Sequence, residues 1–295
     1  MELRVLKYFL EIAKDENLTR AAERLFITQP TLTRQLHQLE EELGKKLYTR
    51  TNYKIKLTDE GKLLRERAQE FLELEEKTKA DIQGAGENIS GVIYIGAGET
   101  SGIKFIGKIL KKLIAQYPKI KYRMISADSE GVTEKLDRGL LDFAVFVGKN
   151  KIEKYNYITL PDSDRWGVIM RKDDPFAEKN FITPEDLLKM PLLTSYQAIT
   201  ENEFEDWLGY PQEKLNLIGF HNLVYNASVM AREGLGAVLT IENIINDNEL
   251  KFLPLKPEIR ARLTLAWRKN SMFSKAAKKF LELAADCLCV KISKL

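Results

Sequence analysis

The sequence predicts an α/β chain in three parts: a small helical unit that ends in a β-hairpin, one long helix, and a larger region of alternating strands and helices. Three observations predict this order. Two short amphipathic helices flank a tight turn near the N-terminus, a charged helical pattern runs over residues 58–82, and apolar strands alternate with helices from residue 91 onward. The three expected parts are residues 1–58, 59–87 and 88–295.

The first short helix has a small apolar face. Thr19 is its candidate N-cap, because a threonine hydroxyl can accept a hydrogen bond from a free backbone N–H at a helix start. Phe26 and Ile27 follow the helix and are expected to fill the turn. The apolar face of the helix comprises Ala21, Ala22 and Leu25.

The second short helix is expected to have one buried stripe and one exposed polar face. Thr28 is its candidate cap, and Pro30 falls in its first turn, where a missing backbone N–H is tolerated. Leucines at steps of three and four residues form the buried stripe, since an α-helix turns once in about 3.6 residues. These leucines are Leu32, Leu36, Leu39 and Leu43.

The polar face opposite the leucines has hydroxyls, amides and a forked guanidinium. Such groups can contact base edges and phosphates when a helix enters the major groove of DNA. The pattern therefore favours a DNA-reading helix-turn-helix over about Leu18 to His37. An ordinary amphipathic helical hairpin is the alternative. The residues expected to contact DNA are Thr28, Gln29, Pro30, Thr31, Thr33, Arg34, His37 and Gln38.

Residues 45–56 form a basic stretch that contains no acidic residue. Apolar and polar residues alternate over 53–57, and the turn-prone pair Thr51–Asn52 comes just before, which predicts a short β-hairpin. A basic hairpin beside a polar helix would bind the phosphate backbone next to the groove. Arg50 and Lys54 are the hairpin residues expected to do so.

These features occur in one order and without a gap, and residues 1–61 resemble the DNA-binding region of LysR-type transcriptional regulators. Thr33 and Tyr48 depart mildly from the family pattern, which usually has serine and phenylalanine there. The resemblance implies a homodimer or homotetramer that binds double-stranded operator DNA and a small-molecule effector, with no cofactor. The matching segments are Phe9 and Ala13, TRAAERL at 19–25, TQPTLTRQL at 28–36, LEEELG at 39–44, LYTR at 47–50 and LTDEG at 57–61.

Residues 58–82 predict one long charged helix, which Gly84 and Gly86 would end. Its apolar positions fall on an imperfect heptad seam that Glu75 interrupts. From the pattern alone, a solvated surface helix is an equal alternative. The resemblance favours dimerisation, because LysR-type regulators pair through a linker helix at this place. The expected contact residues are Leu64 and Phe71, and the other seam positions are Ala68, Thr78 and Ile82.

The order of strands and helices beyond residue 88 predicts parallel strands with crossover helices. The expected strands are Gly91–Gly96, Lys121–Ser126, Phe143–Val147, Gly167–Met170, Leu192–Ser195, Ala237–Thr240 and Leu263–Trp267. The expected helices are Ile103–Tyr117, Val132–Gly139, Thr183–Lys189, Ala227–Gly234 and Ser274–Leu288. The family resemblance implies a two-lobed α/β effector domain similar to periplasmic binding proteins. Its lobe I would span about 88–161 and 265–295, and its lobe II about 162–264.

The turn from Gly96 to Gly102 bears on an enzymatic alternative, because it follows a strand and opens a helix as a dinucleotide-binding motif does. Ser101 stands where that motif needs its third glycine, which comes one residue late. His221 is the only histidine outside the polar helix, and no nucleophile motif lies near it. The alternatives kept are an NAD-dependent oxidoreductase and a small-molecule carrier with an appended helical hairpin. The chain is not expected to be an enzyme.

Thr100 and Ser101 are candidate effector contacts, because they open a helix whose free N–H groups and dipole attract anions. In LysR-type regulators the corresponding turn holds part of the effector. We therefore expect a small anionic effector whose negative group lies at these two residues. A satisfied helix cap or loop hydroxyl is the alternative role for each. The other expected effector residues are Phe146, Ser195, Tyr196 and His221.

The composition limits where such a protein works. The chain has 295 residues, 46 Lys and Arg against 43 Asp and Glu, and a net charge of +3, so DNA affinity must come from local charge placement. No secretory signal and no membrane-length apolar stretch are evident, which favours a cytoplasmic protein. Cys287 and Cys289 are two apart on a predicted helix, so a disulfide between them is not expected. Two histidines and two cysteines at these positions predict no metal site.

Overall fold

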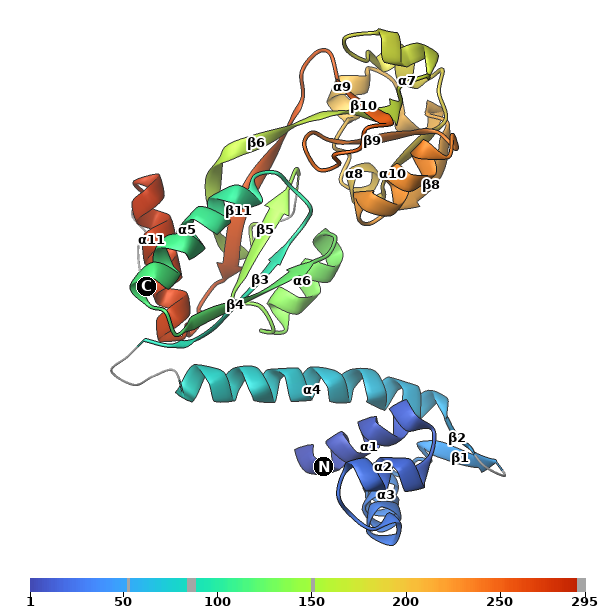
Figure 1. Cartoon of the computed structure of the whole chain (residues 1–295), viewed down its shortest axis with the longest axis vertical. Coiled ribbons are helices and arrows are strands. Elements are labelled where there is room, and N and C mark those ends of the chain that lie inside the picture. The colour runs from blue at the N-terminus through green and yellow to red at the C-terminus, as the bar shows by residue number, and fades with distance from the viewer. Residues whose placement is uncertain (52–53, 84–88, 150–151, 291–295) are drawn as a thin grey trace. The chain divides into compact units, whose positions relative to one another are not determined.

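The chain forms two compact units, Met1–Ala80 and Asp81–Leu295. The structure is a computed structural model that describes residues 1–51, 54–83, 89–149 and 152–290. Figure 1 shows the elements of each unit. Each unit has its own buried apolar core, so the packing of each follows from its own residues.

Helices and a hairpin enclose the core of the first unit. Phe9 of the first helix and the leucines Leu32 and Leu36 of the third are fully buried together. This burial confirms the helix-turn-helix fold predicted from the leucine spacing. The elements are α1 (Leu3–Asp15), α2 (Leu18–Arg24), α3 (Gln29–Leu43), β1 (Tyr48–Thr51), β2 (Lys54–Leu57) and α4 (Asp59–Gln83).

The cap of α2 differs from the prediction, whereas the cap of α3 agrees with it. Asn17 caps α2, because its side-chain oxygen accepts hydrogen bonds from the backbone N–H groups of Thr19 (2.9 Å) and Arg20 (3.1 Å). Thr19 as the cap is therefore wrong; asparagine caps at least as well and stands two positions earlier. Thr28 does cap α3, since its hydroxyl accepts from the Thr31 backbone N–H (3.4 Å).

Two apolar side chains lie outside the core to which the sequence assigned them. Phe26 is 95% exposed, and its backbone has the left-handed φ of 54° that ends α2 and directs its side chain outward. Only Ile27 packs against the core from the turn. Leu43 is 40% exposed, because it lies in the last turn before the C-cap Gly44, beyond the reach of the core. The buried stripe is therefore one leucine shorter than predicted.

β1 and β2 form the predicted wing. The strands are antiparallel, with Tyr48 opposite Leu57. Ile55 points into the core, while Lys54 and Lys56 on either side are exposed, as alternation along a strand requires. Asn52 and Tyr53, which the prediction placed in the turn and at the start of the alternation, lie outside the described residues.

α4 is the predicted long helix. It begins after Thr58, whose hydroxyl accepts a hydrogen bond from the Gly61 backbone N–H (3.0 Å). Along the predicted seam, Ala68 is fully buried and Leu64 packs against the helix-turn-helix core of the same chain, whereas Phe71 is 44% exposed. Within this unit, Phe71 is therefore the aromatic residue of the predicted seam whose side chain stays exposed to solvent. Gly84 and Gly86, the predicted end of the helix, lie outside the described residues.

Glu75, which interrupts the seam, is neutralised by its own chain. Its carboxylate forms ion pairs with Lys79, one turn later on α4, and with Lys7 of α1 (3.0 Å). Hydrogen bonds from these two ammonium groups lower the pKa of the Glu75 carboxyl. The charge at the centre of the seam is therefore compensated before any partner approaches.

The second unit is a mixed sheet covered by helices. Its strand order is β4-β3-β5-β11-β6-β9-β7-β8, with β10 paired to β6. The expected parallel pairing holds for β3 with β4 and β5 and for β7 with β9, and β7 also pairs in parallel with β8, which was not predicted. It is wrong for β6 and β11, which run antiparallel to their neighbours. The strands are β3 (Gly91–Ala97), β4 (Ile120–Ser126), β5 (Phe143–Val147), β6 (Tyr155–Arg171), β7 (Leu192–Ser195), β8 (Leu217–His221), β9 (Ala237–Ile241), β10 (Leu250–Pro254) and β11 (Arg260–Arg268).

The helices of this unit pack on both lobes, and each end of a predicted helix lies within three residues of its expected position. α7 is shorter than expected, with four residues where seven were expected. The short helices α8 and α9 were not predicted. The helices are α5 (Ile103–Gln116), α6 (Ser129–Asp137), α7 (Pro184–Leu187), α8 (Tyr196–Thr200), α9 (Glu205–Leu208), α10 (Val224–Arg232) and α11 (Lys275–Leu288), with short 3₁₀ turns at Pro175–Glu178 and Gln212–Lys214.

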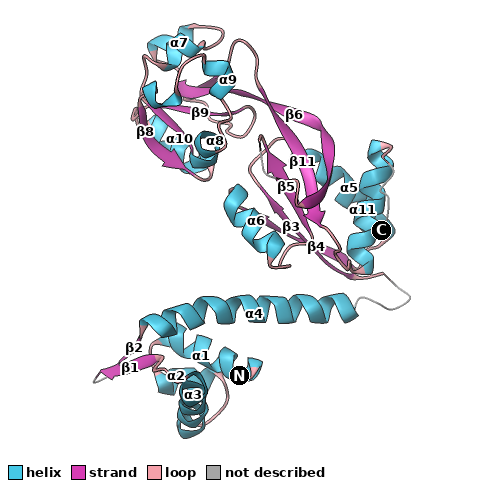
Figure 2. Cartoon of the chain, turned by 180° about the vertical axis from the view of Figure 1, so that it is seen from behind, coloured by secondary structure: helices cyan, strands magenta, loops and turns pink. Residues whose placement is uncertain are grey.

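β6 and β11 connect two lobes with separate cores. Along β6 the core residues change from one cluster to the other between Leu160 and Trp166, and along β11 they change between Ala261 and Leu263. Figure 2 shows both strands running from one lobe into the other. The two crossing strands therefore fix how the facing ends of the lobes meet.

The pairing of these strands is irregular where they cross. Arg262 pairs with Ser163, but Thr264 pairs with Thr159, so residues 160–162 lie opposite one residue of β11. This is a bulge, and it contains the proline at position 161, which is the kind of site where a strand tolerates a residue without an N–H.

Candidate DNA-binding surface and effector pocket

The exposed face of α3 and the wing contact each other through side chains. The Thr33 hydroxyl accepts from Gln29, one turn earlier on α3 (3.4 Å), and from Arg50 of β1 (3.5 Å). The Thr28 and Thr31 hydroxyls lie 2.8 Å apart at the start of the helix. The structure therefore brings the predicted residues of the helix start and of the wing together on one polar surface.

Arg34 lies in the middle of this surface. Its side chain is exposed and forms no hydrogen bond or ion pair within the part of the chain that the structure describes. Further along α3, His37 pairs with Glu41 (3.3 Å) and Gln38 accepts from its neighbour Gln35 (3.3 Å). A guanidinium without an intramolecular partner keeps its donors available for a base or a phosphate.

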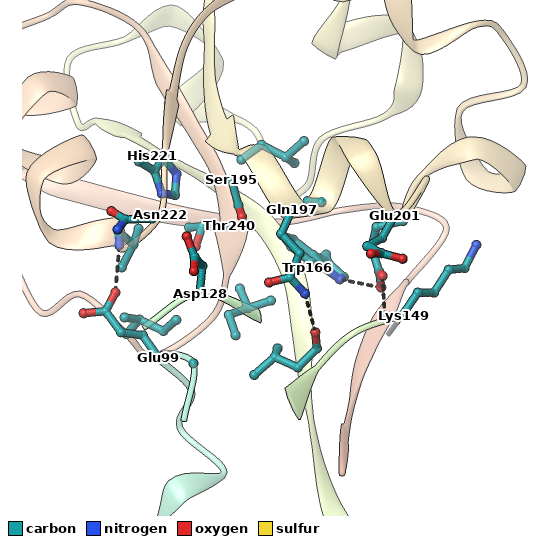
Figure 3. Close-up of a pocket in the computed structure, with 18 of the residues that line it drawn as sticks. Glu99, Asp128, Lys149, Trp166, Ser195, Gln197, Glu201, His221, Asn222 and Thr240 are labelled. Atoms are coloured by element: carbon teal, nitrogen blue, oxygen red, sulfur yellow. Dashed lines mark hydrogen bonds between the residues drawn. The ribbon is translucent and has the colours of Figure 1, made fainter. Parts of the chain in front are cut away.

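In the second unit, two adjoining cavities lie between the lobes. The smaller cavity holds about 80 Å³ and the larger about 630 Å³, and the larger volume falls in the size range of small-molecule pockets. Figure 3 shows the smaller cavity with residues from both lobes pointing into it. The residues that line both cavities are Asp128 of lobe I and Ser195, Gln197, Glu201, His221 and Asn222 of lobe II.

Hydrogen bonds join the lobes across the smaller cavity. Glu99, in the turn between β3 and α5, accepts from the backbone N–H of Val224 at the start of α10 (2.7 Å). Gln197 of α8 accepts from the Ser129 N–H at the start of α6 (3.2 Å) and donates to the Val147 carbonyl at the end of β5 (3.3 Å). Each lobe thus supplies a side chain to a helix start of the other.

His221 lines both cavities from the end of β8. Both of its ring nitrogens are buried, and neither has a hydrogen-bond partner among the described residues. Burial lowers the pKa of the imidazole to about 4, so the ring is neutral near pH 7. The ring as a whole is partly exposed, but a buried donor and a buried acceptor without partners are costly unless something binds them, which makes His221 the strongest indication of a ligand position.

Acidic side chains outnumber basic ones around the cavities. Glu203 is buried and held by the Lys149 backbone N–H (2.7 Å) and the Trp166 indole N–H (3.2 Å). Among the described lining residues the cations are Lys149 and Lys154, and Lys154 is paired with Asp137 (2.6 Å). The Lys149 ammonium donates to a backbone carbonyl at position 202 (3.1 Å). The carboxylates of the lining are Glu99, Asp128, Glu130, Glu153, Glu201 and Glu203.

Thr100 and Ser101 line neither cavity. Their hydroxyls donate short hydrogen bonds to the carboxylate of Asp164, a residue of β6 that is only 2% exposed. The negative group expected beside these hydroxyls is therefore present, but the chain itself supplies it. Of the other predicted effector residues, Ser195 and His221 line both cavities, and Phe146 and Tyr196 line the larger one.

Comparison with known proteins identifies both units. Residues 3–62 match the bacterial regulatory helix-turn-helix proteins of the lysR family, and residues 86–288 match the LysR substrate binding domain. The chain belongs to the LysR family. An uncharacterized HTH-type transcriptional regulator of Methanocaldococcus jannaschii is 32% identical over 241 residues, which cover 79% of this chain and 80% of that protein. One from Bacillus subtilis is 28% identical over 291 residues, which cover 96% and 98%.

A solved LysR structure supports the fold. Full-length CbnR complexed with its target DNA is similar with a TM-score of 0.76 at 18% identity, over 97% of this chain and 99% of that one. Because the models and relatives describe transcriptional regulators, this LysR chain is a regulator and not an enzyme. The glycine-rich turn at 96–102 belongs to its substrate-binding domain. No described helix is long and apolar enough to cross a membrane.

Reasoning from the sequence of this LysR regulator missed three acidic residues that shape its cleft. Asp128 was noticeable only as an acid after a strand, although it caps α6 by accepting from the Gly131 N–H (3.0 Å). Glu99 lies in the glycine-rich turn at 96–102 and Glu201 lies outside any motif, and neither was singled out. Local sequence pattern does not reveal contacts such as these, which form only when the lobes face each other.

Proposed function

We propose that this regulator binds operator DNA through α3 and the wing, as a dimer or tetramer, and responds to a small molecule held between the lobes of its effector domain. The observation that carries the proposal is the cleft itself. Side chains from both lobes meet there, and the His221 nitrogens lack partners. A ligand bound at these nitrogens lies beside the hydrogen bonds that join the lobes, so it can compete with those bonds and change how the lobes are held.

The DNA contacts follow from the surface on α3. Arg34 is proposed to contact base edges, because its guanidinium is exposed and unpaired among the described residues. Arg50 and Lys54 of the wing would bind phosphates. The similar CbnR was solved with its target DNA, which supports a DNA-binding role for this fold. The remaining contacts proposed are Thr28, Gln29, Pro30, Thr31, Thr33, His37 and Gln38.

The structure changes which residues are proposed to contact the effector. Ser195 and His221, with Phe146 and Tyr196 on the wider side, remain proposed contacts. An anion at Thr100 and Ser101 is no longer favoured, because Asp164 occupies their hydroxyls. Those two residues are instead proposed to hold the β3–α5 turn against β6.

A gel shift on duplex DNA from the region flanking this chain's own gene tests the DNA-binding half. The proposal expects stepwise complexes whose affinity falls as salt rises, because phosphate contacts release counterions. A small-molecule screen by thermal shift tests the effector half, since a compound that binds only the folded domain raises its melting temperature. A screened compound should also change the affinity for DNA.

Variants locate the response. His221→Leu is expected to abolish the effector's thermal shift and leave DNA binding intact. Tyr122→Leu is the control, since it removes a polar group from an exposed position on β4 that lines neither cavity. An effector that shifts the His221→Leu protein as much as the parent, or DNA binding that is insensitive to salt, would contradict the proposal.

A further inference from the structure

The start of α10 lacks a cap from its own sequence. The N-cap position holds Leu223, an apolar residue that has no side-chain acceptor, and the helix runs from Val224 to Arg232. Asn222 accepts from the Leu223 N–H (2.9 Å), which leaves the first N–H of the helix proper to be satisfied from elsewhere. The free N–H groups of a helix start, together with its dipole, attract negative charge.

Glu99 supplies that negative charge from the other lobe. Its carboxylate accepts from the Val224 N–H at 2.7 Å, the length of a charge-assisted hydrogen bond. Figure 3 shows this bond bridging the cleft beside Asn222 and His221. A carboxylate fixed here occupies the position that an anionic ligand would take at a helix N-terminus.

Two further observations concern the same place. The buried nitrogens of His221, three residues before α10, have no partner among the described residues, so a ligand position adjoins the Glu99 bond. A free carboxylate nearby also repels anions: Glu201 lines both cavities, and its side chain forms no hydrogen bond or ion pair in the described part of the chain.

We infer that Glu99 determines the charge specificity of the cleft: it acts as a built-in anion at the start of α10, excludes anionic effectors, and directs the site toward molecules that present an ammonium or another hydrogen-bond donor. Glu201 and Asp128 are placed to accept such donors. This inference rests on the proposed effector function of the cleft, and it reverses the charge expected from the sequence alone.

Removal of the built-in anion gives the sharpest test. In Glu99→Ala the Val224 N–H loses its acceptor, so the variant should gain a site for the probe anion sulfate. Thermal melts of the full chain in sulfate, against chloride at equal ionic strength, should show an added sulfate-dependent rise for Glu99→Ala relative to the parent. Titration calorimetry should show sulfate binding at least about tenfold tighter than to the parent, the effect of one charge-assisted hydrogen bond.

Two variants separate this role from general charge. Glu99→Gln keeps an acceptor at the same reach and should not gain the sulfate response, although it loses the same charge. Glu201→Ala removes an equal charge from the same cavities without touching α10, and should not gain it either. Sulfate binding by all three variants would overturn the inference in favour of a general charge effect, and so would equal sulfate binding by the parent.

Small amines and acids test the selectivity of the parent. Methylammonium is expected to raise the melting temperature of the parent more than that of Glu201→Ala, and acetate to have no such effect. Stabilisation of the parent by acetate, lost in His221→Leu, would overturn the inference while leaving an effector cleft in place. These melts involve no DNA, so the inference and the proposed regulatory function can fail separately.

Discussion

Arg34 differs from its neighbours on α3 because its side chain has no internal contact that DNA binding would have to break. Its guanidinium is exposed and unpaired in the described part of the chain, whereas His37 is held by Glu41 and Thr33 is shared by two other side chains. A side chain that breaks no internal contact on binding contributes its full interaction with the DNA. Arg34 is therefore the position where a single truncation tells most about base reading.

Arg34→Ala is expected to cost about 1 to 3 kcal/mol of specific operator binding and to leave the fold unchanged, because the lost donors face solvent in the free protein. Lys54→Ala is the matched control on the wing. It should weaken binding to all DNA sequences to the same extent and reduce the dependence of the affinity on salt concentration. Gel shifts on operator and unrelated duplexes at several salt concentrations measure both. Unchanged affinity of Arg34→Ala for the operator would remove α3 as the reading helix.

His221 makes the stability of the effector domain depend on pH. Burial lowers the pKa of its imidazole from 6.5 to about 4, although carboxylates line the same cavity. Between these pH values the unfolded chain binds a proton that the folded chain does not. The contribution of His221 to the free energy of unfolding is therefore complete above about pH 6.5, and it decreases as the pH falls toward 4.

His221→Gln removes this titration and keeps a polar side chain of similar reach. The parent is expected to lose more free energy of unfolding between pH 7 and pH 5 than the variant does, as measured by urea unfolding of both proteins at each pH. Carboxylates elsewhere titrate in both proteins and cancel in the comparison. Parallel losses in the two proteins would mean that His221 is not buried as a neutral ring.

At the scale of elements, sequence periodicity predicted those elements that bury one clear face. The leucine steps of α3 and the apolar run Phe143–Val147 are examples, and β5 has the predicted bounds. β8 was missed because it is an edge strand with only partly buried positions and a glycine at 219. The first half of β6 was missed because its polar run 161–165 resembles a loop. Residues 163–165 of this run pair with β11 at the lobe crossing, which local pattern does not reveal.

The same reasoning limits the prediction of the sites. The DNA-binding face could be predicted because it is one side of one helix, fixed by the buried side. The cleft could be located only roughly, because its key contacts join residues that lie 50 to 125 positions apart in the chain, Glu99 and Val224 being the most distant pair. Burial of Asp164 beneath Thr100 and Ser101 likewise required the fold.

Phe71 is the aromatic position on α4 that its own unit leaves open. If α4 pairs with a second copy, Phe71→Glu would bury a charge without a partner and weaken the dimer by about 2 kcal/mol or more. Light scattering should then report a smaller species, and cooperative DNA binding should be lost. Leu63→Glu is the control, since Leu63 is also exposed on α4 but lies off the seam. A parent protein that is monomeric at micromolar concentration would exclude pairing through α4.

The whole molecule combines two units whose cores share no residue. Within the second unit, β6 and β11 contribute residues to the cores of both lobes and couple them, whereas no core residue is shared with the first unit, so each unit is expected to melt in its own transition. In calorimetry of the full chain, operator DNA should raise the melting temperature of the first unit, and a cleft ligand should raise that of the second, because each ligand binds one folded unit. A single transition raised equally by both would mean that the units unfold as one.

The bulge between the crossing strands affects the rate of hydrogen exchange as well as the geometry of the sheet. Amide protons exchange with solvent where ladder bonds are missing, and residues 160–162 face a single residue of β11. Deuterium should therefore enter the amides around Pro161 sooner than those of the flanking pairs, such as Tyr157 with Ala266. If the two strands open first at the bulge, the lobes can rotate about this point. The amide protons in the rest of the sheet should then exchange much more slowly.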